Sequence, residues 1–160
     1  MRLQINSFFK FFISLALCLA VGGISGFITA NEITSWYATL NKPSFNPPNW
    51  IFSPVWTTLY IFMAISLWLV WKSNVISTIK RNALTIFSIQ LILNFFWSII
   101  FFRFHQTGIA LIEIVLLWIF ILLSIIKFRP ISKTASYLLI PYLLWVSFAS
   151  VLNFEIWRLN

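Results

Sequence analysis

The chain has 160 residues, of which 61% are hydrophobic and only 9% charged, and its net charge is +8. Soluble domains carry about 25% charged residues, so this composition excludes a soluble globular protein and predicts a membrane protein with a single domain over residues 1–160. Because the basic residues lie in short clusters between apolar runs, the charge indicates membrane topology and argues against nucleic-acid binding.

The residue types needed for common metal and catalytic sites are scarce. The chain has one cysteine, one histidine and three acidic residues, and none of the acids is an aspartate. These counts exclude a structural zinc site, so we expect no metal site and no ordinary hydrolase chemistry.

Five apolar runs are long enough to cross the hydrocarbon core of a bilayer, which takes about 20 residues. We therefore predict an all-α membrane protein, a bundle of five transmembrane helices with a structured first loop. The predicted spans are residues 8–29, 50–71, 82–102, 108–127 and 134–157. Lys and Arg are more numerous on the side of the N-terminus, so we expect a bacterial inner-membrane protein with that end in the cytoplasm and the first loop outside.

The first span follows basic residues, as the apolar part of a signal peptide would. Its apolar run is longer than the 7–15 residues of a signal peptide, which favours a retained helix. Small residues recur four apart along one face of this helix: Ser14, Cys18, Gly22 and Gly26. Such a ridge lets another helix approach closely, either inside the bundle or in a homodimer.

Residues 41–56 read NKPSFNPPNWIFSPVW and hold most of the chain's six prolines. Proline fixes backbone angles and lowers the cost of ordering a long loop, so this segment predicts a stiff first loop. Ser53 followed by Pro54 is typical of a helix start, and we expect the second helix to begin there. Trp56 and Tyr60 then share one of its faces.

The third span places amides and aromatic rings on one face, at Gln90, Asn94, Trp97 and Phe101. Uncompensated amides in hydrocarbon cost several kcal/mol, so we expect this face to point into the bundle. The amides either join helices to one another or contact a ligand.

The fourth and fifth spans each carry one unusual residue. Glu113 is an intramembrane carboxylate, which is either a proton or cation site or a structural partner of Arg103 or of nearby hydroxyls. Pro141 removes a backbone donor and exposes the carbonyl of Tyr137. Beyond it, one stripe either packs in the core or lines a cavity: Tyr142, Trp145, Ala149 and Leu152.

Short motifs follow one another in the first loop and in every span but the first. They are Trp36-Tyr37-Ala38, Asn41-Lys42-Pro43-Ser44-Phe45, Pro47-Pro48, Pro54-Val55-Trp56, Thr58-Leu59-Tyr60, Leu93-Asn94, Trp97, Phe101-Phe102, Ala110-Leu111, Glu113, Pro141-Tyr142-Leu143, Trp145, Phe148-Ala149, Leu152-Asn153 and Trp157-Arg158. In order and spacing they resemble the TspO/MBR family of tryptophan-rich sensory and translocator proteins, also called peripheral-type benzodiazepine receptors. The proline common in the third span of that family is absent, with Ser98-Ile99 in its place.

The resemblance implies a five-helix bundle that often forms a homodimer, with a ligand cavity under the first loop. Family ligands are porphyrins and other tetrapyrroles, with cholesterol in animal members, and no cofactor is required. The ligand-binding residues that it implies are Trp36, Tyr37, Pro48, Trp56, Tyr60, Asn94, Trp97, Tyr142, Trp145, Ala149 and Asn153. We add Lys42 as a partner for the propionates of a porphyrin or haem, on charge grounds.

Three functions follow from this resemblance and from the residues. The leading one is a membrane receptor or sensor for porphyrins, linked to tetrapyrrole transport or stress signalling, with membrane lipid as its surroundings. The second is light-dependent porphyrin degradation, with Trp56 and Trp145 as catalytic residues. The third is a small-molecule transporter coupled through Glu113. Sterol binding is disfavoured, since the animal motif needs a tyrosine where this chain has Phe154.

Overall fold

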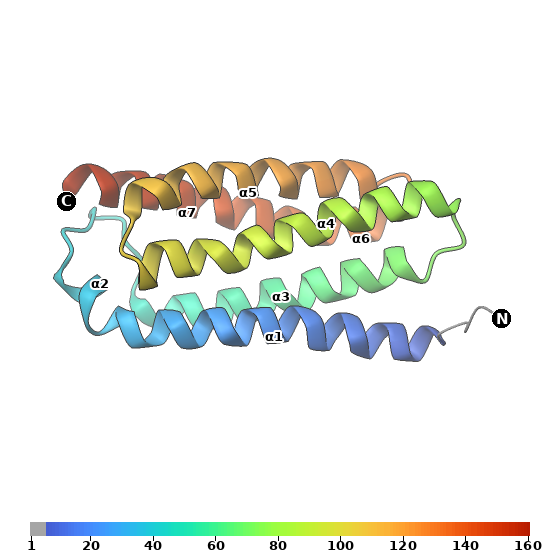
Figure 1. Cartoon of the computed structure of the whole chain (residues 1–160), viewed down its shortest axis with the longest axis horizontal. Coiled ribbons are helices and arrows are strands. Elements are labelled where there is room, and N and C mark those ends of the chain that lie inside the picture. The colour runs from blue at the N-terminus through green and yellow to red at the C-terminus, as the bar shows by residue number, and fades with distance from the viewer. Residues whose placement is uncertain (1–5) are drawn as a thin grey trace.

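The protein is described from a computed structural model, which covers residues 6–160. Five long helical segments run side by side along the molecule, each long and apolar enough to cross a membrane (Figure 1). In chain order they are α1 (Ser7–Ile33), α3 (Asn49–Trp71), α4 (Ser77–Ser98) with its extension η1 (Ile99–Arg103), α5 (Thr107–Phe128), and the pair α6 (Lys133–Leu138) and α7 (Ile140–Leu159). The short helix α2 (Trp36–Thr39) lies in the first loop. The predicted all-α bundle is confirmed, and each predicted span lies inside one of these segments.

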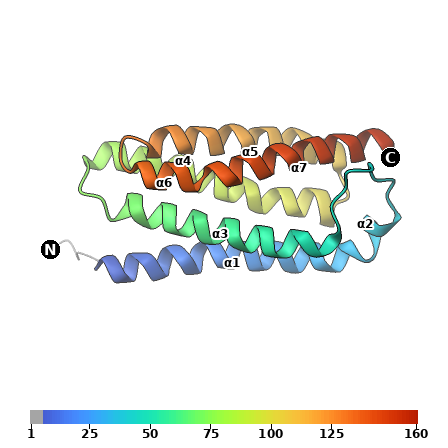
Figure 2. The same ribbon diagram turned by 180° about the vertical axis from the view of Figure 1, so that it is seen from behind.

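The first loop and the C-terminus lie at one end of the bundle, and the N-terminal end of α1 lies at the other (Figures 1 and 2). We call the first the loop end and the second the basic end. At the loop end the Asn41 amide N–H donates to Oδ1 of Asn160, and Nδ2 of Asn160 donates to the Asn41 carbonyl, both at 3.0 Å. The last residue therefore holds the loop against the bundle.

The start of α3 differs from the prediction. The helix begins at Asn49, directly after Pro48, and Pro54 lies inside it. The expectation that the helix begins at Ser53 is wrong, because Pro48 already sets an extended backbone (φ −55°, ψ 140°) from which the helix can start. Pro54 sits one turn further on, where its missing N–H costs only one early helical bond, to the carbonyl of Trp50.

Pro141 interrupts the last span, as its chemistry predicts. Helix α6 ends at Leu138, and α7 starts at Ile140 with the proline in its first turn. Helix α3 stabilises this interrupted segment, because the Ser66 hydroxyl of α3 donates to the Ala135 carbonyl of α6 at 2.7 Å. The two pieces therefore pack as one membrane-spanning unit with a bend.

A π-helical turn extends α4 at the position where Ser98 and Ile99 stand. The Phe104 amide N–H donates to the Ile99 carbonyl at 2.9 Å, five residues back. The wider turn brings Phe101 and Phe102 into the core under the first loop, where both are buried. Turns of this kind are frequent at functional sites, and this one shapes the floor beneath the loop.

The first three residues of the small-residue ridge on α1, Ser14, Cys18 and Gly22, pack inside the bundle. Helix α1 lies along α3, and Ser14 and Cys18 are fully buried. A Cβ added at Gly22 would lie 2.4 Å from the ring of Tyr60, so this contact requires glycine. A Cβ added at Gly26 would meet no atom within 4 Å. The last residue of the ridge, Gly26, therefore faces open space.

Candidate ligand-binding site

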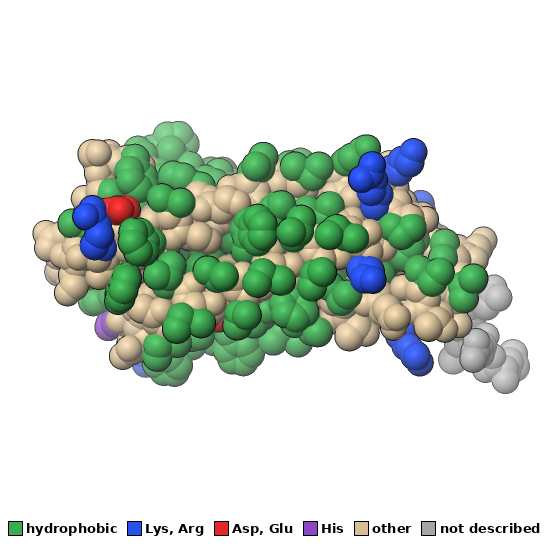
Figure 3. Space-filling view, turned by 90° about the horizontal axis from the view of Figure 1, so that it is seen from above, with side chains coloured by type: hydrophobic (Ala, Val, Ile, Leu, Met, Phe, Trp, Pro, Cys, Tyr) green, Lys and Arg blue, Asp and Glu red, His purple; other side chains and the backbone are tan. Residues whose placement is uncertain are grey.

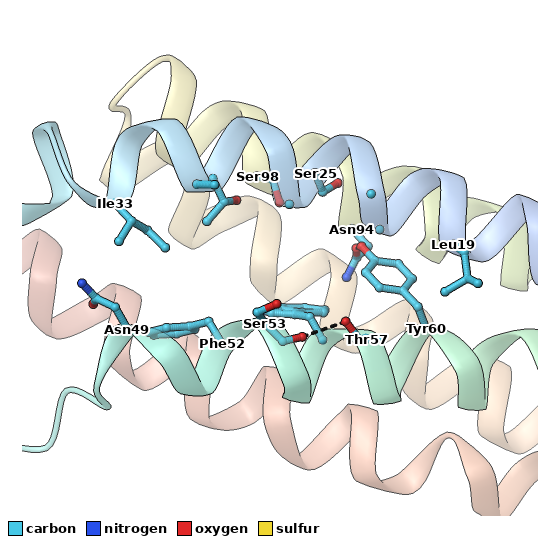
Figure 4. Close-up of a pocket in the computed structure, with 16 residues that line it drawn as sticks. Leu19, Ser25, Ile33, Asn49, Phe52, Ser53, Thr57, Tyr60, Asn94 and Ser98 are labelled. Carbon is cyan, nitrogen blue, oxygen red and sulfur yellow. Dashed lines mark hydrogen bonds between the residues drawn. The ribbon is translucent and has the colours of Figure 1, made fainter.

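Two cavities lie between the helices in the half of the bundle nearer the loop end. The larger, which we call the lateral cavity, measures about 380 Å³ and lies between α1, α3 and α4 (Figure 4). It is lined by Leu19, Gly22, Gly23, Ser25, Gly26, Thr29, Ala30, Ile33, Asn49, Phe52, Ser53, Trp56, Thr57, Tyr60, Asn94 and Ser98. The second, which we call the loop cavity, measures about 30 Å³ and lies directly under the first loop. It is lined by Ile33, Tyr37, Phe52, Trp97, Phe101, Phe102, Ala149, Leu152, Asn153 and Ile156.

A buried hydrogen-bond chain closes the inner end of the lateral cavity. The Tyr60 hydroxyl donates to Oδ1 of Asn94, and Nδ2 of Asn94 donates to the Tyr142 hydroxyl at 2.8 Å. The ring of Trp56 packs on both phenols, with centroids 5.8 Å from Tyr60 and 6.2 Å from Tyr142. Asn94 thus joins α3, α4 and α7, which is one of the two roles that its sequence position suggested, and its side chain also lines the cavity.

The buried amide of Gln90, one turn before Asn94 in α4, is less well satisfied. Both polar atoms of the Asn94 side chain form hydrogen bonds. Gln90 has only a long contact from Nε2 to the Met63 sulfur, at 3.9 Å. Oε1 of Gln90 has no hydrogen-bond partner among the described residues. Gln90 is buried and lines neither cavity, which places it in the core of the bundle.

A second polar chain borders the loop cavity. The Trp97 indole N–H donates to Oδ1 of Asn153 at 3.2 Å, and Nδ2 of Asn153 donates to the Thr107 carbonyl at 2.8 Å. The Trp97 ring stacks on Phe101, with centroids 5.2 Å apart. These contacts fix the wall of the loop cavity between α4, α5 and α7.

The first loop covers this cavity and is held by its own side chains. The Tyr37 hydroxyl donates to Oδ1 of Asn46 at 2.7 Å, and burial raises the pKa of the Tyr37 phenol to about 12. The Lys42 ammonium donates to the carbonyls of Tyr37, Ala38 and Leu40 at 2.8, 3.3 and 2.9 Å. It also lies 5.1 Å from the centre of the Tyr37 ring. All three donors of Lys42 are therefore used by the loop.

His105 lies outside both cavities. Its ring stacks on Trp36 with centroids 4.1 Å apart, and its Nε2 lies 3.2 Å from Oε2 of Glu32. Trp36 also packs against Phe101, at 5.6 Å between centroids. This cluster ties the turn between η1 and α5 to the end of α1 and to the first loop.

The structure groups the predicted ligand-binding residues unevenly. The lateral cavity is lined by Trp56, Tyr60 and Asn94, and the loop cavity by Tyr37, Trp97, Ala149 and Asn153. Tyr142 is fully buried behind Asn94. Besides Tyr142, four other residues line neither cavity: Trp36, Lys42, Pro48 and Trp145. Trp145 instead borders an outer groove between α3 and α7, and its buried indole N–H has no acceptor among the described residues.

The hydroxyl side of the lateral cavity was missed by sequence reasoning. Ser25, Thr29, Ser53, Thr57 and Ser98 all line it. Ser25 is buried, and its hydroxyl has no hydrogen-bond partner among residues 6–160. Figure 4 shows the side chains of α3 rising toward those of α1 across the cavity. Scattered hydroxyls in an apolar run carry no periodic signal, and the motifs that guided the prediction do not include the first span.

Glu113 is buried in α5 away from both cavities. Neither of its carboxylate oxygens has a hydrogen-bond partner in the part of the chain that the structure describes. The expected pairing with Arg103 or with nearby hydroxyls is therefore not found. The residue remains a buried acid without a structural explanation.

Comparison with known proteins places these features in a family. The family model described as TspO/MBR family matches residues 14–158. The tryptophan-rich protein TspO of Chlorobaculum tepidum is 48% identical over 150 residues, which cover 91% of this chain and 92% of the relative. The translocator protein of Bos taurus is 34% identical over 152 residues, 92% and 89% of the two chains. The tryptophan-rich sensory protein of Cereibacter sphaeroides is 34% identical over 146 residues, 91% and 88% of the two chains.

Proposed function

The chain belongs to the TspO/MBR family of integral membrane proteins, and from this membership we propose that it is a receptor or sensor that binds a porphyrin or related tetrapyrrole. The observation that carries the proposal is the lateral cavity. Its volume of about 380 Å³ lies in the range of small-molecule sites. Its walls combine aromatic rings with a few hydroxyl and amide groups, the usual composition of such sites.

The ring of a porphyrin is large, flat and apolar, and indole and phenol rings offer matching surfaces with a polar edge. Trp56 and Tyr60 supply these surfaces in the lateral cavity. The loop cavity, at about 30 Å³, is far smaller than a small-molecule site. Because Phe52 and Ile33 line both cavities, a turn of the Phe52 side chain would join them and give the ligand access to Tyr37 and Trp97.

The acidic side chains of the ligand need a partner at the loop end. In the proposed complex, Lys42 exchanges one of its three carbonyl contacts for a propionate oxygen, which is a stronger, charge-assisted bond. Arg158 already pairs with Glu155, at 2.6 Å between Nη2 and Oε2. Binding would therefore loosen the first loop, and in this proposal the loosened loop is the signal that the sensor transmits.

A titration of the full-length protein in detergent tests the proposal. Protoporphyrin IX should quench tryptophan fluorescence, and Gly26→Leu should weaken its binding at least tenfold, because Gly26 lines the lateral cavity and an added Cβ there meets no atom within 4 Å, so a larger side chain would occupy cavity space. Ala20→Leu is the matched control, since Ala20 lies exposed on the same helix and lines no cavity. Wild-type affinity in Gly26→Leu would refute the proposed site.

Two further variants examine the loop end. Tyr37→Ala removes a wall of the loop cavity, and Trp145→Ala removes the ring that packs on Phe52, at 6.1 Å between centroids. Both should reduce the affinity for protoporphyrin IX less than Gly26→Leu does. Unchanged affinity in both variants would confine the ligand to the lateral cavity and remove the first loop from the proposal.

Light-dependent degradation is a second candidate, favoured by the position of Trp56 against the lateral cavity. Trp145 lies outside both cavities, so in this candidate it would act through Phe52 and not by direct contact. Illumination of the bound porphyrin should then bleach its absorption, and Trp56→Phe should slow the bleaching more than Trp145→Phe. A stable absorption spectrum under light would exclude this function.

Coupled transport is a third candidate, favoured by the buried and unpaired carboxylate of Glu113. An intramembrane acid of this kind can carry a proton or a cation with the substrate. Flux of protoporphyrin IX into liposomes should then stop in Glu113→Gln while binding persists. Equal flux in wild type and variant would exclude the coupling.

A further inference from the structure

An open groove lies at the basic end, far from the proposed ligand site. It measures about 470 Å³ and runs between the start of α1, the end of α3 and the first turns of α4. It is lined by Lys10, Trp71, Ser77, Lys80, Arg81, Leu84, Thr85, Ser88 and Ile89. We call it the basic groove.

The cations of the basic groove have no acidic neighbour. The chain has three acids, and all of them lie elsewhere: Glu32 contacts His105, Glu155 pairs with Arg158, and Glu113 is buried in α5. Figure 3 shows Lys and Arg side chains gathered toward this end of the face that it draws, while an acidic side chain lies beside a basic one toward the other end. No salt bridge at the basic end is found among residues 6–160.

The hydrogen-bonding state of these cations differs. The Lys80 ammonium donates to the Ser73 carbonyl at 2.7 Å, which holds the turn between α3 and α4. The side-chain nitrogens of Lys10 and Arg81 donate to no acceptor in the described part of the chain. Three like charges that line one groove repel one another, so the groove is electrostatically complementary to an anion.

The groove also has a polar and an apolar part. Ser77, Arg81 and Ser88 lie close to one face of α4, since residues three, four, seven and eleven apart align on a helix. Leu84 and Ile89 continue the lining toward the middle of the membrane. The cations line the part of the groove nearer the turn between α3 and α4, and Leu84 and Ile89 add apolar surface beyond them beside Thr85 and Ser88. This order matches a molecule with an anionic head and an apolar chain.

The ends of the spans give the level at which the groove is expected in a membrane. Helix α3 ends at Trp71 and α4 begins at Ser77, so the intervening turn lies where two spans leave the membrane. Trp71 lines the groove at this level, the usual place of an interfacial tryptophan. Basic pockets between transmembrane helices on this kind of surface bind the headgroups of anionic lipids.

We infer that the basic groove is a specific site for an anionic phospholipid. Lys10 and Arg81 contact the phosphate from α1 and α4, and the hydroxyls of Ser77 and Thr85 are within the same lining. One acyl chain of the lipid runs along Leu84 and Ile89. The bound lipid links α1 to α4 at the end where the first loop provides no support.

Lipid retention by the full-length protein, measured by native mass spectrometry in detergent, tests this inference. Palmitoyl-oleoyl phosphatidylglycerol should be retained at about tenfold lower concentration than phosphatidylcholine with the same chains, given the attraction of each Lys or Arg to an anionic headgroup. Lys10→Gln combined with Arg81→Gln should abolish most of this preference. Lys127→Gln combined with Arg129→Gln removes the same charge outside the groove and should preserve it.

Two additions separate this inference from simpler explanations. Lys10→Arg combined with Arg81→Lys keeps both charges and should restore the preference for phosphatidylglycerol, which distinguishes lost binding from misfolding. Equal losses in the two charge-removing pairs would overturn the inference, because they would show general charge attraction. Displacement of the lipid by millimolar inorganic phosphate would overturn it too, by assigning the groove to a free anion.

Discussion

The two ends of the bundle differ in which of their polar side chains find partners within the chain. At the loop end, three polar side chains find partners within the chain: Lys42 on three carbonyls, Arg158 on Glu155, and Asn160 on Asn41. At the basic end, Lys10 and Arg81 have no such partner among the described residues. The loop end is therefore built to close over a cavity, and the basic end is built to be completed by the membrane around it.

The largest expected effect concerns the packing that supports the lateral cavity. Gly22→Ala places a methyl group 2.4 Å from the ring of Tyr60, which must move away from Asn94. Such overpacking costs about 1–3 kcal/mol. The thermal midpoint in detergent should fall clearly for Gly22→Ala and stay unchanged for Gly23→Ala, where an added Cβ meets nothing within 4 Å. Equal midpoints would show that Tyr60 has room to shift.

Replacing one lysine at each end compares the two ends directly. Lys42→Met removes three bonds to loop carbonyls, and the first loop should then be cleaved about tenfold faster in limited proteolysis, because a hydrogen bond to a charged group contributes about 1.5–3 kcal/mol. Lys72→Met removes only a cation–π contact, 3.5 Å above the ring of Trp68. It should leave the cleavage of the first loop unchanged. Similar cleavage in both variants would show that Lys42 does not hold the loop.

The closure of the loop end also predicts a response to alkali. Burial raises the pKa of the Tyr37 phenol to about 12, against about 10 in an unfolded chain. A raised pKa means that the unfolded chain loses this proton first, so the contribution of Tyr37 to stability is constant below about pH 10 and declines from there to pH 12. Denaturation in detergent should show this decline in the wild type and less of it in Tyr37→Phe. An identical decline in the two proteins would assign it to other groups.

The smallest expected effect concerns surface charge without lipid. In a zwitterionic detergent at low salt, Lys10→Gln combined with Arg81→Gln should leave stability unchanged or raise it slightly, since like charges are removed from one groove. Arg158→Gln should lower stability by about 0.2–1 kcal/mol, the usual contribution of an exposed ion pair. If the basic-end pair lowered stability more than Arg158→Gln, the cations there would have partners within the chain.

Several features could be predicted from local sequence, and their physical origin explains why. The five spans follow from hydropathy alone, because only long apolar helices satisfy their backbone inside a membrane. The bend at Pro141 follows from its missing N–H. The start of α3 did not follow, because Pro48 and Ser53-Pro54 offer two competing helix starts and local rules do not rank them. The π-helical turn after Ser98 had no signal beyond a missing proline.

The candidate site was predictable only in part. Aromatic and amide residues such as Trp56, Tyr60 and Asn94 stand out in an apolar chain, and they do border the lateral cavity. The roles of the Ser25 hydroxyl and of the open space beside Gly26 could not be predicted, because they depend on how α1 packs against α3. The charge of Lys42 suggested a ligand partner, yet its reach to three carbonyls depends on the path of the loop. Whether a ligand displaces one of them stays a prediction.

By itself, then, the sequence determined the class of this protein, the number of its membrane spans and the segregation of its charges, since composition and hydropathy act locally along the chain. The tertiary structure alone decided which polar groups meet. It brought Asn94 between two phenols, left both oxygens of Glu113 without a partner, and set Lys10 and Arg81 along one groove. These outcomes depend on how neighbouring helices are rotated and shifted against one another, which the packing of many side chains sets together.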